Sequence, residues 1–222
     1  MIKAKHKKEI LESLKKIFPR IGFEGFHYFE ICSEAYTLVK RARTKIRERQ
    51  PKDGSVPKFD LKIVNLLHEI SKQEDVAIAF AALCLEACIW DYAGCKMSHK
   101  KVTDNFGSLN LVGKWVVIPQ LLCDSDITTV RIGDTYLLGR LRELKKARDG
   151  LVHPKSKPLP DNYKDAIKAT IPKPKSITAE DAFGLIGLLL GELEKVDKTN
   201  WWFFQTDKYK ISINKLHESS AR

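Results

Sequence analysis

Hydrophobic residues recur at helical spacing along almost the whole chain, and the alternation typical of β-strands is nearly absent. The strongest example is the segment 74–97, whose centre reads AIAFAALCLEACIWDYAGC and is apolar on nearly every side of the helix it would form. A helix of that kind has to be buried, because no face of it is suited to water. The sequence therefore predicts an all-α fold, an up-and-down helical bundle with this segment at its centre.

Further helices are expected on both sides of this segment, separated by proline- and glycine-rich breaks. Thr178 is the expected N-cap of the last helix, with Asp181 three residues further on. The stretch 99–107 is expected to be a polar loop, and the stretch 154–174, which holds five prolines, a long loop. The expected helices are 7–18, about 26–49, 59–71, 74–97, one or two short helices within 108–122, 134–151 and 178–196.

The break PKDGSVPK at 51–58 divides the chain into expected units. Residues 1–50 are predicted to form an N-terminal helical pair, 59–197 the main bundle and 198–222 a C-terminal tail. The tail contains Trp-Trp-Phe-Phe at 201–204, which is expected to be a hydrophobic flap or dimer contact, with base stacking as the alternative.

Basic residues exceed acidic ones, 39 against 28, which gives a net charge of +11. A surplus of this size attracts polyanions, of which nucleic acid is the commonest, although a basic surface without such a partner is the alternative. The surplus is densest in one predicted helix, where a row of cations is a candidate RNA-binding surface. A solvated helix face is the alternative interpretation. The six cations are Lys40, Arg41, Arg43, Lys45, Arg47 and Arg49.

The five cysteines are odd in number and contain no Cys-x-x-Cys pair, which favours a reducing compartment. The charged N-terminus lacks the apolar run of a signal peptide, and the apolar stretch 183–190 is too short to span a membrane. We therefore expect a cytoplasmic protein without membrane association. Cys84, Cys88, Cys95 and His99 would share one helix face, but Cys84 and Cys95 would lie about 16 Å apart, which excludes a single metal ion bound by all four. No metal or other cofactor is expected.

The segment LRELKKARDGLVHPK holds the best candidates for chemistry. Arg148 could bind a phosphate through its guanidinium, and His153 could withdraw the proton of an RNA 2′-hydroxyl group. Asp149 lies beside the arginine and could orient one of them. These groups suffice to cleave RNA without a metal ion. In the alternative interpretation Gly150 ends the helix and His153 is only a turn residue.

The same residues resemble the HEPN family, whose motif is R-x(4–6)-H with a polar residue directly after the arginine. A second resemblance lies upstream, where the segment 81–94, AALCLEACIWDYAG, looks like the buried helix of many bacterial HEPN proteins. The resemblance extends over roughly 59–197. It departs from some toxin members, which carry a tyrosine after the histidine where this chain has Lys155.

Similarity to that family implies a homodimer in which paired motifs face each other, and metal-independent endoribonuclease activity in toxin–antitoxin or antiphage defence. An antitoxin or another defence protein would then be a partner. The resemblance assigns phosphate binding to Arg148, acid–base catalysis to His153 and an orienting role to Asp149. Some members of the family have lost catalysis, so a non-catalytic module that binds RNA, a nucleotide or a protein is the alternative.

Glu86 lies in the middle of the most apolar segment. A carboxylate buried there needs a cation or a hydroxyl group as its partner. Arg148 is the expected candidate, and Glu86 would then support the site. A position on a partly exposed stripe of the helix is the alternative.

Overall fold

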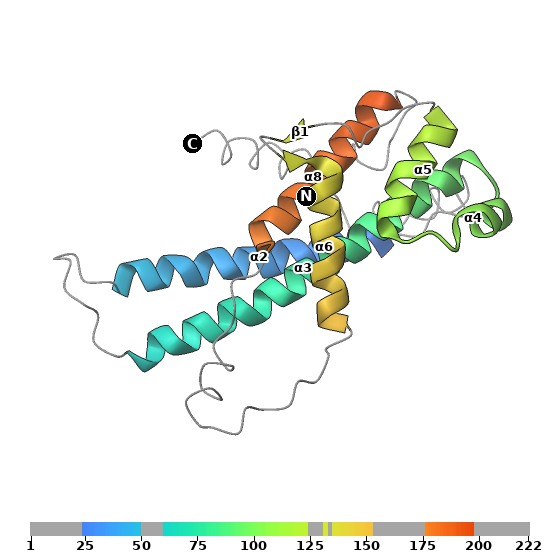
Figure 1. The fold of residues 1–222 in the computed structure, drawn as a ribbon. Coiled ribbons are helices and arrows are strands. Elements are labelled where there is room, and N and C mark those ends of the chain that lie inside the picture. Colours follow the sequence, from blue (N-terminus) through green and yellow to red (C-terminus); the bar gives the residue numbers. More distant parts are fainter. Residues whose placement is uncertain (1–23, 50–59, 124–130, 133–134, 153–175, 198–222) are drawn as a thin grey trace, which may run out of the picture.

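The structure is a computed structural model that describes residues 24–49, 60–123, 131–132, 135–152 and 176–197. This part of the chain forms six α-helices and a short antiparallel pairing of two two-residue strands (Figure 1). The all-α prediction is therefore confirmed. The helices are α2 (Glu24–Arg49), α3 (Leu61–Lys96), α4 (His99–Phe106), α5 (Leu111–Cys123), α6 (Leu137–Val152) and α8 (Ala179–Val196), and the strands are β1 (Arg131–Ile132) and β2 (Thr135–Tyr136).

Helices α2 and α3 form a long antiparallel hairpin (Figure 1). Part-way along the hairpin, an ion pair between Arg43 and Glu74 at 2.8 Å joins the two helices. Closer to the core, the Cys32 thiol donates a hydrogen bond to the Ala77 carbonyl oxygen at 3.4 Å. The hairpin extends well beyond α6 and α8, so only its inner half belongs to the bundle.

The prediction of two separate helices at 59–71 and 74–97 is wrong, because α3 is a single helix of 36 residues. The sequence changes there from polar to apolar, but it contains no proline or glycine that would interrupt the backbone. Asp60 caps the helix by accepting a hydrogen bond from the Lys62 amide at 2.8 Å. Within the helix, Gln73 bonds to Glu69 at 2.7 Å across the expected break.

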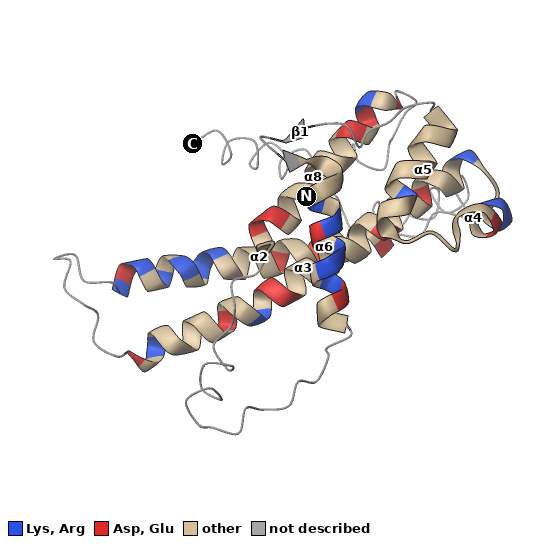
Figure 2. Ribbon diagram, viewed as in Figure 1, with Lys and Arg blue, Asp and Glu red and all other residues tan. Residues whose placement is uncertain are grey.

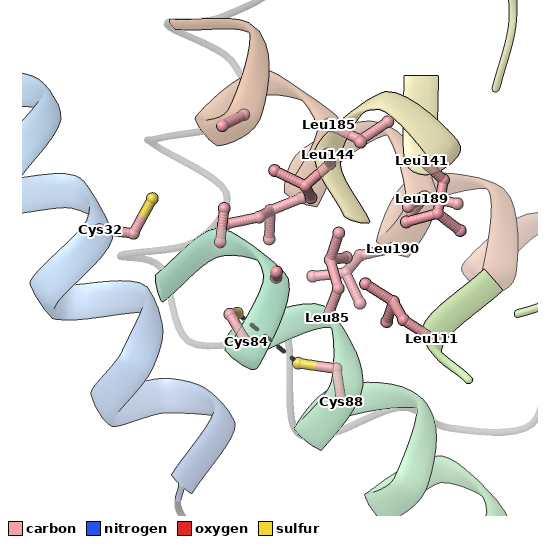
Figure 3. Packing of buried hydrophobic residues seen from close by; sticks show 14 of the residues in the cluster. Cys32, Cys84, Leu85, Cys88, Leu111, Leu141, Leu144, Leu185, Leu189 and Leu190 are labelled. Atoms are coloured by element: carbon pink, nitrogen blue, oxygen red, sulfur yellow. Dashed lines mark hydrogen bonds between the residues drawn. The ribbon is translucent and has the colours of Figure 1, made fainter. Parts of the chain in front are cut away.

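The inner half of α3 is the centre of the hydrophobic core, as the sequence predicts. It contacts α2, α4, α5, α6 and α8. Leu85 lies among leucines from three other helices (Figure 3). These neighbours are Leu111, Leu141, Leu144, Leu185, Leu189 and Leu190. Residues from α2, among them Phe29, Cys32 and Tyr36, belong to the same core. The expected boundary at 51–58 lies outside the described residues.

By length and composition alone, α3 is also able to cross a membrane. Its most apolar stretch of 18 residues has a mean hydropathy of 1.7, and 56% of that stretch is buried inside the bundle. The bent pair of α4 and α5 passes the same test when taken together. The core helix of a bundle meets this criterion too, and the five helices packed on α3 account for its apolar composition.

The remaining helices follow the predictions with one exception. Residues 99–107 were expected to form a loop, but α4 occupies them because Ser98 caps its first turn and Val102 and Phe106 are buried four residues apart. Helix α5 continues through Pro119, and α6 starts at Leu137 after the short strand β2.

The predicted cap of α8 is confirmed. Thr178 and Asp181 form a capping box in which each side chain binds the other residue's amide. Several other expectations concern residues outside the described part of the chain. They are the helix at 7–18, the loop at 154–174, the Trp-Trp-Phe-Phe cluster at 201–204 and His153.

Candidate functional site

Helix α6 carries Arg148 and Asp149 in its last turns, and it is the second strongly basic helix of the described chain beside α2 (Figure 2). It holds five cations and two acids. Arg140 has a structural task, because it binds Glu143 at 2.8 Å and Asp181 at the start of α8 at 2.5 Å. The basic side chains that remain are concentrated towards the C-terminal end of the helix. They are Arg142, Lys145, Lys146 and Arg148.

Arg148 is partly buried, with 24% of its side chain exposed. Its Nε atom lies 3.1 Å from Asp149 Oδ1, which is an ion-pair distance. The Nε atom is nevertheless buried and forms no hydrogen bond within the described part of the chain, because the N–H group is not directed at this oxygen. Asp149 is also bound by Lys145 at 2.5 Å, one helical turn earlier. The guanidinium group therefore keeps a buried donor unused.

Two apolar residues follow the Arg148–Asp149 pair on the surface. Leu151 is 36% exposed and Val152 is 55% exposed at the end of α6. Along the same helix, the leucines Leu137, Leu141 and Leu144 are fully buried, so the buried face of α6 ends before Leu151 and Val152. His153 follows directly and lies outside the described residues, so its distance from Arg148 stays a prediction.

Glu86 has a cationic partner, but that partner is Lys114 of α5 rather than Arg148. Lys114 Nζ lies 2.6 Å from Glu86 Oε1 and 4.6 Å from the centre of the Trp90 ring. The lysine side chain is 8% exposed and the glutamate side chain 34% exposed. The pair therefore joins α3 to α5, and it gives no direct support to the Arg148 motif.

The six cations of α2 are distributed around the helix rather than along one face. Two of them are ion-paired, Arg43 with Glu74 at 2.8 Å and Arg49 with Asp60 at 3.5 Å. The ammonium group of Lys40 lies 5.4 Å from the centre of the Tyr36 ring. Arg41, Lys45 and Arg47 are exposed. A nucleic acid on one side of the hairpin would thus meet only part of the predicted set.

The structure brings Lys45 and Arg49 together at a surface hollow of about 580 Å³ near the tip of the hairpin. Lys62 of α3 lines the same hollow and adds a cation that the sequence analysis did not select. Lys62 carries no signal of this role in the sequence, because it lies 13 residues after Arg49 and is flanked by apolar residues. The carboxylate of Glu48 lines the hollow as well, and the excess of three cations over one acid is a suitable contact for a phosphate group.

Asp91 of α3 is the described carboxyl group whose pKa is raised most clearly. Burial, together with the nearby carboxylate of Glu24, raises the pKa of Asp91 to about 7. Its Oδ2 atom is buried and has no hydrogen-bond partner in the described part of the chain. It lies on α3 beside the start of α2 and not on the basic surface of α6.

Three of the cysteines are buried in the core. Cys84 Sγ and Cys88 Sγ are 3.9 Å apart (Figure 3), and burial raises the pKa of the Cys32 thiol to about 12. Such thiols are protonated and unreactive near neutral pH. Among the described residues, no group of three or more histidine, cysteine or acidic side chains is arranged to hold a metal ion.

Comparison with known proteins adds no assignment: no protein-family model, no curated protein sequence and no solved structure matches this chain.

Proposed function

We propose that the protein is a metal-independent endoribonuclease of the HEPN type, with Arg148, Asp149 and His153 as its catalytic group. The observation that carries the proposal is the incomplete bonding of Arg148. Buried donors in folded proteins are nearly always satisfied, so the unused Nε–H indicates that the protein does not fully bond this guanidinium group, whose exposed part is open to a ligand. A phosphate oxygen is the acceptor that a guanidinium group binds best.

In this mechanism Arg148 binds the scissile phosphate and stabilises the charge that builds up on its oxygens. His153 removes the proton from the adjacent 2′-hydroxyl group, and the 2′-oxygen attacks phosphorus. The bond from phosphorus to the 5′-oxygen breaks, and the leaving oxygen takes up a proton. The products are a 2′,3′-cyclic phosphate and a 5′-hydroxyl end. Asp149 limits the movement of Arg148 by its ion pair.

The proposal includes a homodimer, in which two copies of the motif face each other. The exposed Leu151 and Val152 support it, because apolar side chains beside the motif are suited to a self-complementary contact. Lys45 and Arg49 of α2, with Lys62 of α3, would bind the RNA further from the cleavage point. A role in toxin–antitoxin or antiphage defence, in the cytoplasm, is part of the same proposal.

The test is RNA cleavage by the full-length protein in EDTA. His153→Ala and Arg148→Lys are expected to lower the cleavage rate by at least about 100-fold, because each loses an acid–base or bidentate contact. The matched controls are His99→Ala on α4 and Arg142→Lys on α6, which change exposed residues of the same types. A 2′-deoxy nucleotide at the cleaved position should stop the reaction. Undiminished cleavage by His153→Ala would refute the assignment.

A non-catalytic binding module is the second candidate, and one observation favours it. Lys145 and Arg148 both lie within ion-pair distance of Asp149, so the charges near the motif already compensate each other in part. In that case the wild type binds RNA, a nucleotide or a protein without cleaving RNA. This candidate is favoured if the wild type binds RNA without cleaving it and if Arg148→Lys weakens that binding.

A further inference from the structure

One face of the α2–α3 hairpin is buried on the inner half of the hairpin, and the same face is left uncovered on the outer half. On the inner half, Tyr36 and Phe29 of α2 pack against Phe183 of α8, with ring centres 5.0 and 5.3 Å apart. Ile78 of α3 is buried in the same hydrophobic cluster as these rings. Beyond α6 and α8 both helices continue outwards, and no other described helix covers them there (Figure 1).

Three large apolar side chains lie exposed on this outer part of α3. Leu61 is 61% exposed, Val64 is 43% exposed and Leu67 is 53% exposed. Residues three apart on an α-helix are turned by about 300°, so the three form a stripe that winds slowly round the helix. Val64 and Leu67 extend the side on which Ile78 is buried, whereas Leu66 and Ile70 are turned towards α2 and are partly buried. An apolar surface is thus continued past the point where the bundle ends.

Basic side chains border this stripe on the α2 side. Lys40 stacks on Tyr36, which itself faces α8, so the lysine marks the same face of the hairpin. Arg47, two turns further along α2, is exposed at the outer end of that face. Between the helices, Arg43 is ion-paired with Glu74 at 2.8 Å, so these two charges compensate each other. We call the surface formed by Val64, Leu67, Lys40 and Arg47 the hairpin face.

Charge restricts what can cover the hairpin face. The segments of this chain that lie outside the described residues and are long enough to reach it are all basic. Residues 1–23 hold seven cations and two acids, 153–175 hold six and two, and 198–222 hold five and two. A second copy would bring the same excess of cations. Nucleic acid would neutralise the cations, but it has no apolar surface that suits aliphatic side chains, and its bases prefer aromatic platforms.

We propose that the hairpin face is the docking site of an acidic amphipathic helix of a partner protein. Its apolar side would cover Val64 and Leu67, and its acidic flank would lie along Lys40 and Arg47. This is the arrangement of helix-in-groove recognition, with apolar anchors one turn apart and charges at the rim. The partner helix would extend the bundle outwards, taking the place that α8 occupies on the inner half. The inference is independent of the proposed nuclease activity.

The probe is a synthetic amphipathic peptide of about five helical turns, with leucine on one side and glutamate on both flanks. Its binding to the full-length protein is measured by fluorescence anisotropy. The variant V64Q/L67Q should bind at least about tenfold more weakly, because two apolar anchors are lost. The matched control is L121Q, which changes a leucine that is 66% exposed on α5 and should bind as the wild type does.

A second peptide with glutamine in place of glutamate tests the charge. It should bind more weakly than the acidic peptide at low salt, and the difference should shrink as salt is added. RNA cleavage or RNA binding by V64Q/L67Q should equal that of the wild type, which separates this inference from the proposed function. The proposal is overturned if V64Q/L67Q leaves peptide affinity unchanged. It is also overturned if the variant instead abolishes self-association, binding to anionic vesicles or binding to RNA.

Discussion

The ion pair between Glu86 and Lys114 should be strongly asymmetric when either partner is changed. Lys114 is the buried member, since its side chain is 8% exposed against 34% for Glu86. Among the described residues, Glu86 is the carboxylate within ion-pair distance of this ammonium group, so Glu86→Gln removes its counter-charge and leaves the ammonium group buried. Lys114→Met leaves a carboxylate that water can reach, and the methionine keeps most of the apolar contact with Trp90.

The magnitudes follow from burial. Breaking a fully buried ion pair by removing one partner costs about 3–5 kcal/mol. The Trp90 ring still attracts the ammonium group at 4.6 Å and glutamine can still accept its hydrogen bond, so we expect Glu86→Gln to lower the free energy of unfolding by about 2 kcal/mol. For Lys114→Met we expect a loss below about 1 kcal/mol, because the remaining carboxylate is hydrated.

Urea denaturation followed by circular dichroism measures both changes, provided that the slope of the transition is the same for all variants. The double variant Glu86→Gln with Lys114→Met should be about as stable as Lys114→Met alone, because the buried charge that needed compensation is gone. If Lys114→Met were as destabilising as Glu86→Gln, or if the two losses simply added, the description of Lys114 as the dependent partner would be wrong.

Two further predictions concern titratable groups of α2 and α3. Asp91→Asn should raise the melting temperature near pH 8 and leave it unchanged near pH 4. The pKa of Asp91 is raised from 3.8 to about 7, so ionisation of this carboxyl group destabilises the folded state as pH rises through that interval. An equal gain in melting temperature at both pH values would contradict this. Iodoacetamide near pH 8 should modify the exposed Cys95 well before the buried Cys32, because burial raises the pKa of the Cys32 thiol to about 12. Peptide mass spectrometry before and after unfolding in urea measures the extent of modification at each cysteine. Equal rates of modification in the native protein would contradict the burial of Cys32.

The sequence predicted most helices of the described chain because burial of one face imposes a regular spacing on apolar residues. It predicted the start of α8 as well, because the Thr178–Asp181 cap is a local pattern. It failed where a change of composition was mistaken for a change of structure. The step from polar to apolar residues near Gln73 marks the point where α3 enters the bundle, and the backbone passes through it without interruption.

The candidate site was predictable only in part. Arg148 and Asp149 lie on one helix, so their proximity follows from the sequence. The partner of Glu86 does not, because Lys114 is 28 positions away and reaches it only through the packing of α5 on α3. The sequence also did not predict which α2 cations are ion-paired, because the partners of Arg43 and Arg49 are Glu74 and Asp60, which lie beyond the turn of the hairpin. The meeting of Arg148 with His153 remains a prediction.

Because α3 is continuous, the length by which the hairpin projects from the bundle can change without altering the packing of the core. At about 1.5 Å per residue, its 36 residues measure about 54 Å, and only the inner part is needed for the bundle. Matched deletions of about seven residues from the end of α2 and the beginning of α3 would shorten the projection by about 10 Å while every leucine of the interior kept its neighbours. Length at the tip and packing at the base can therefore diverge separately among related chains.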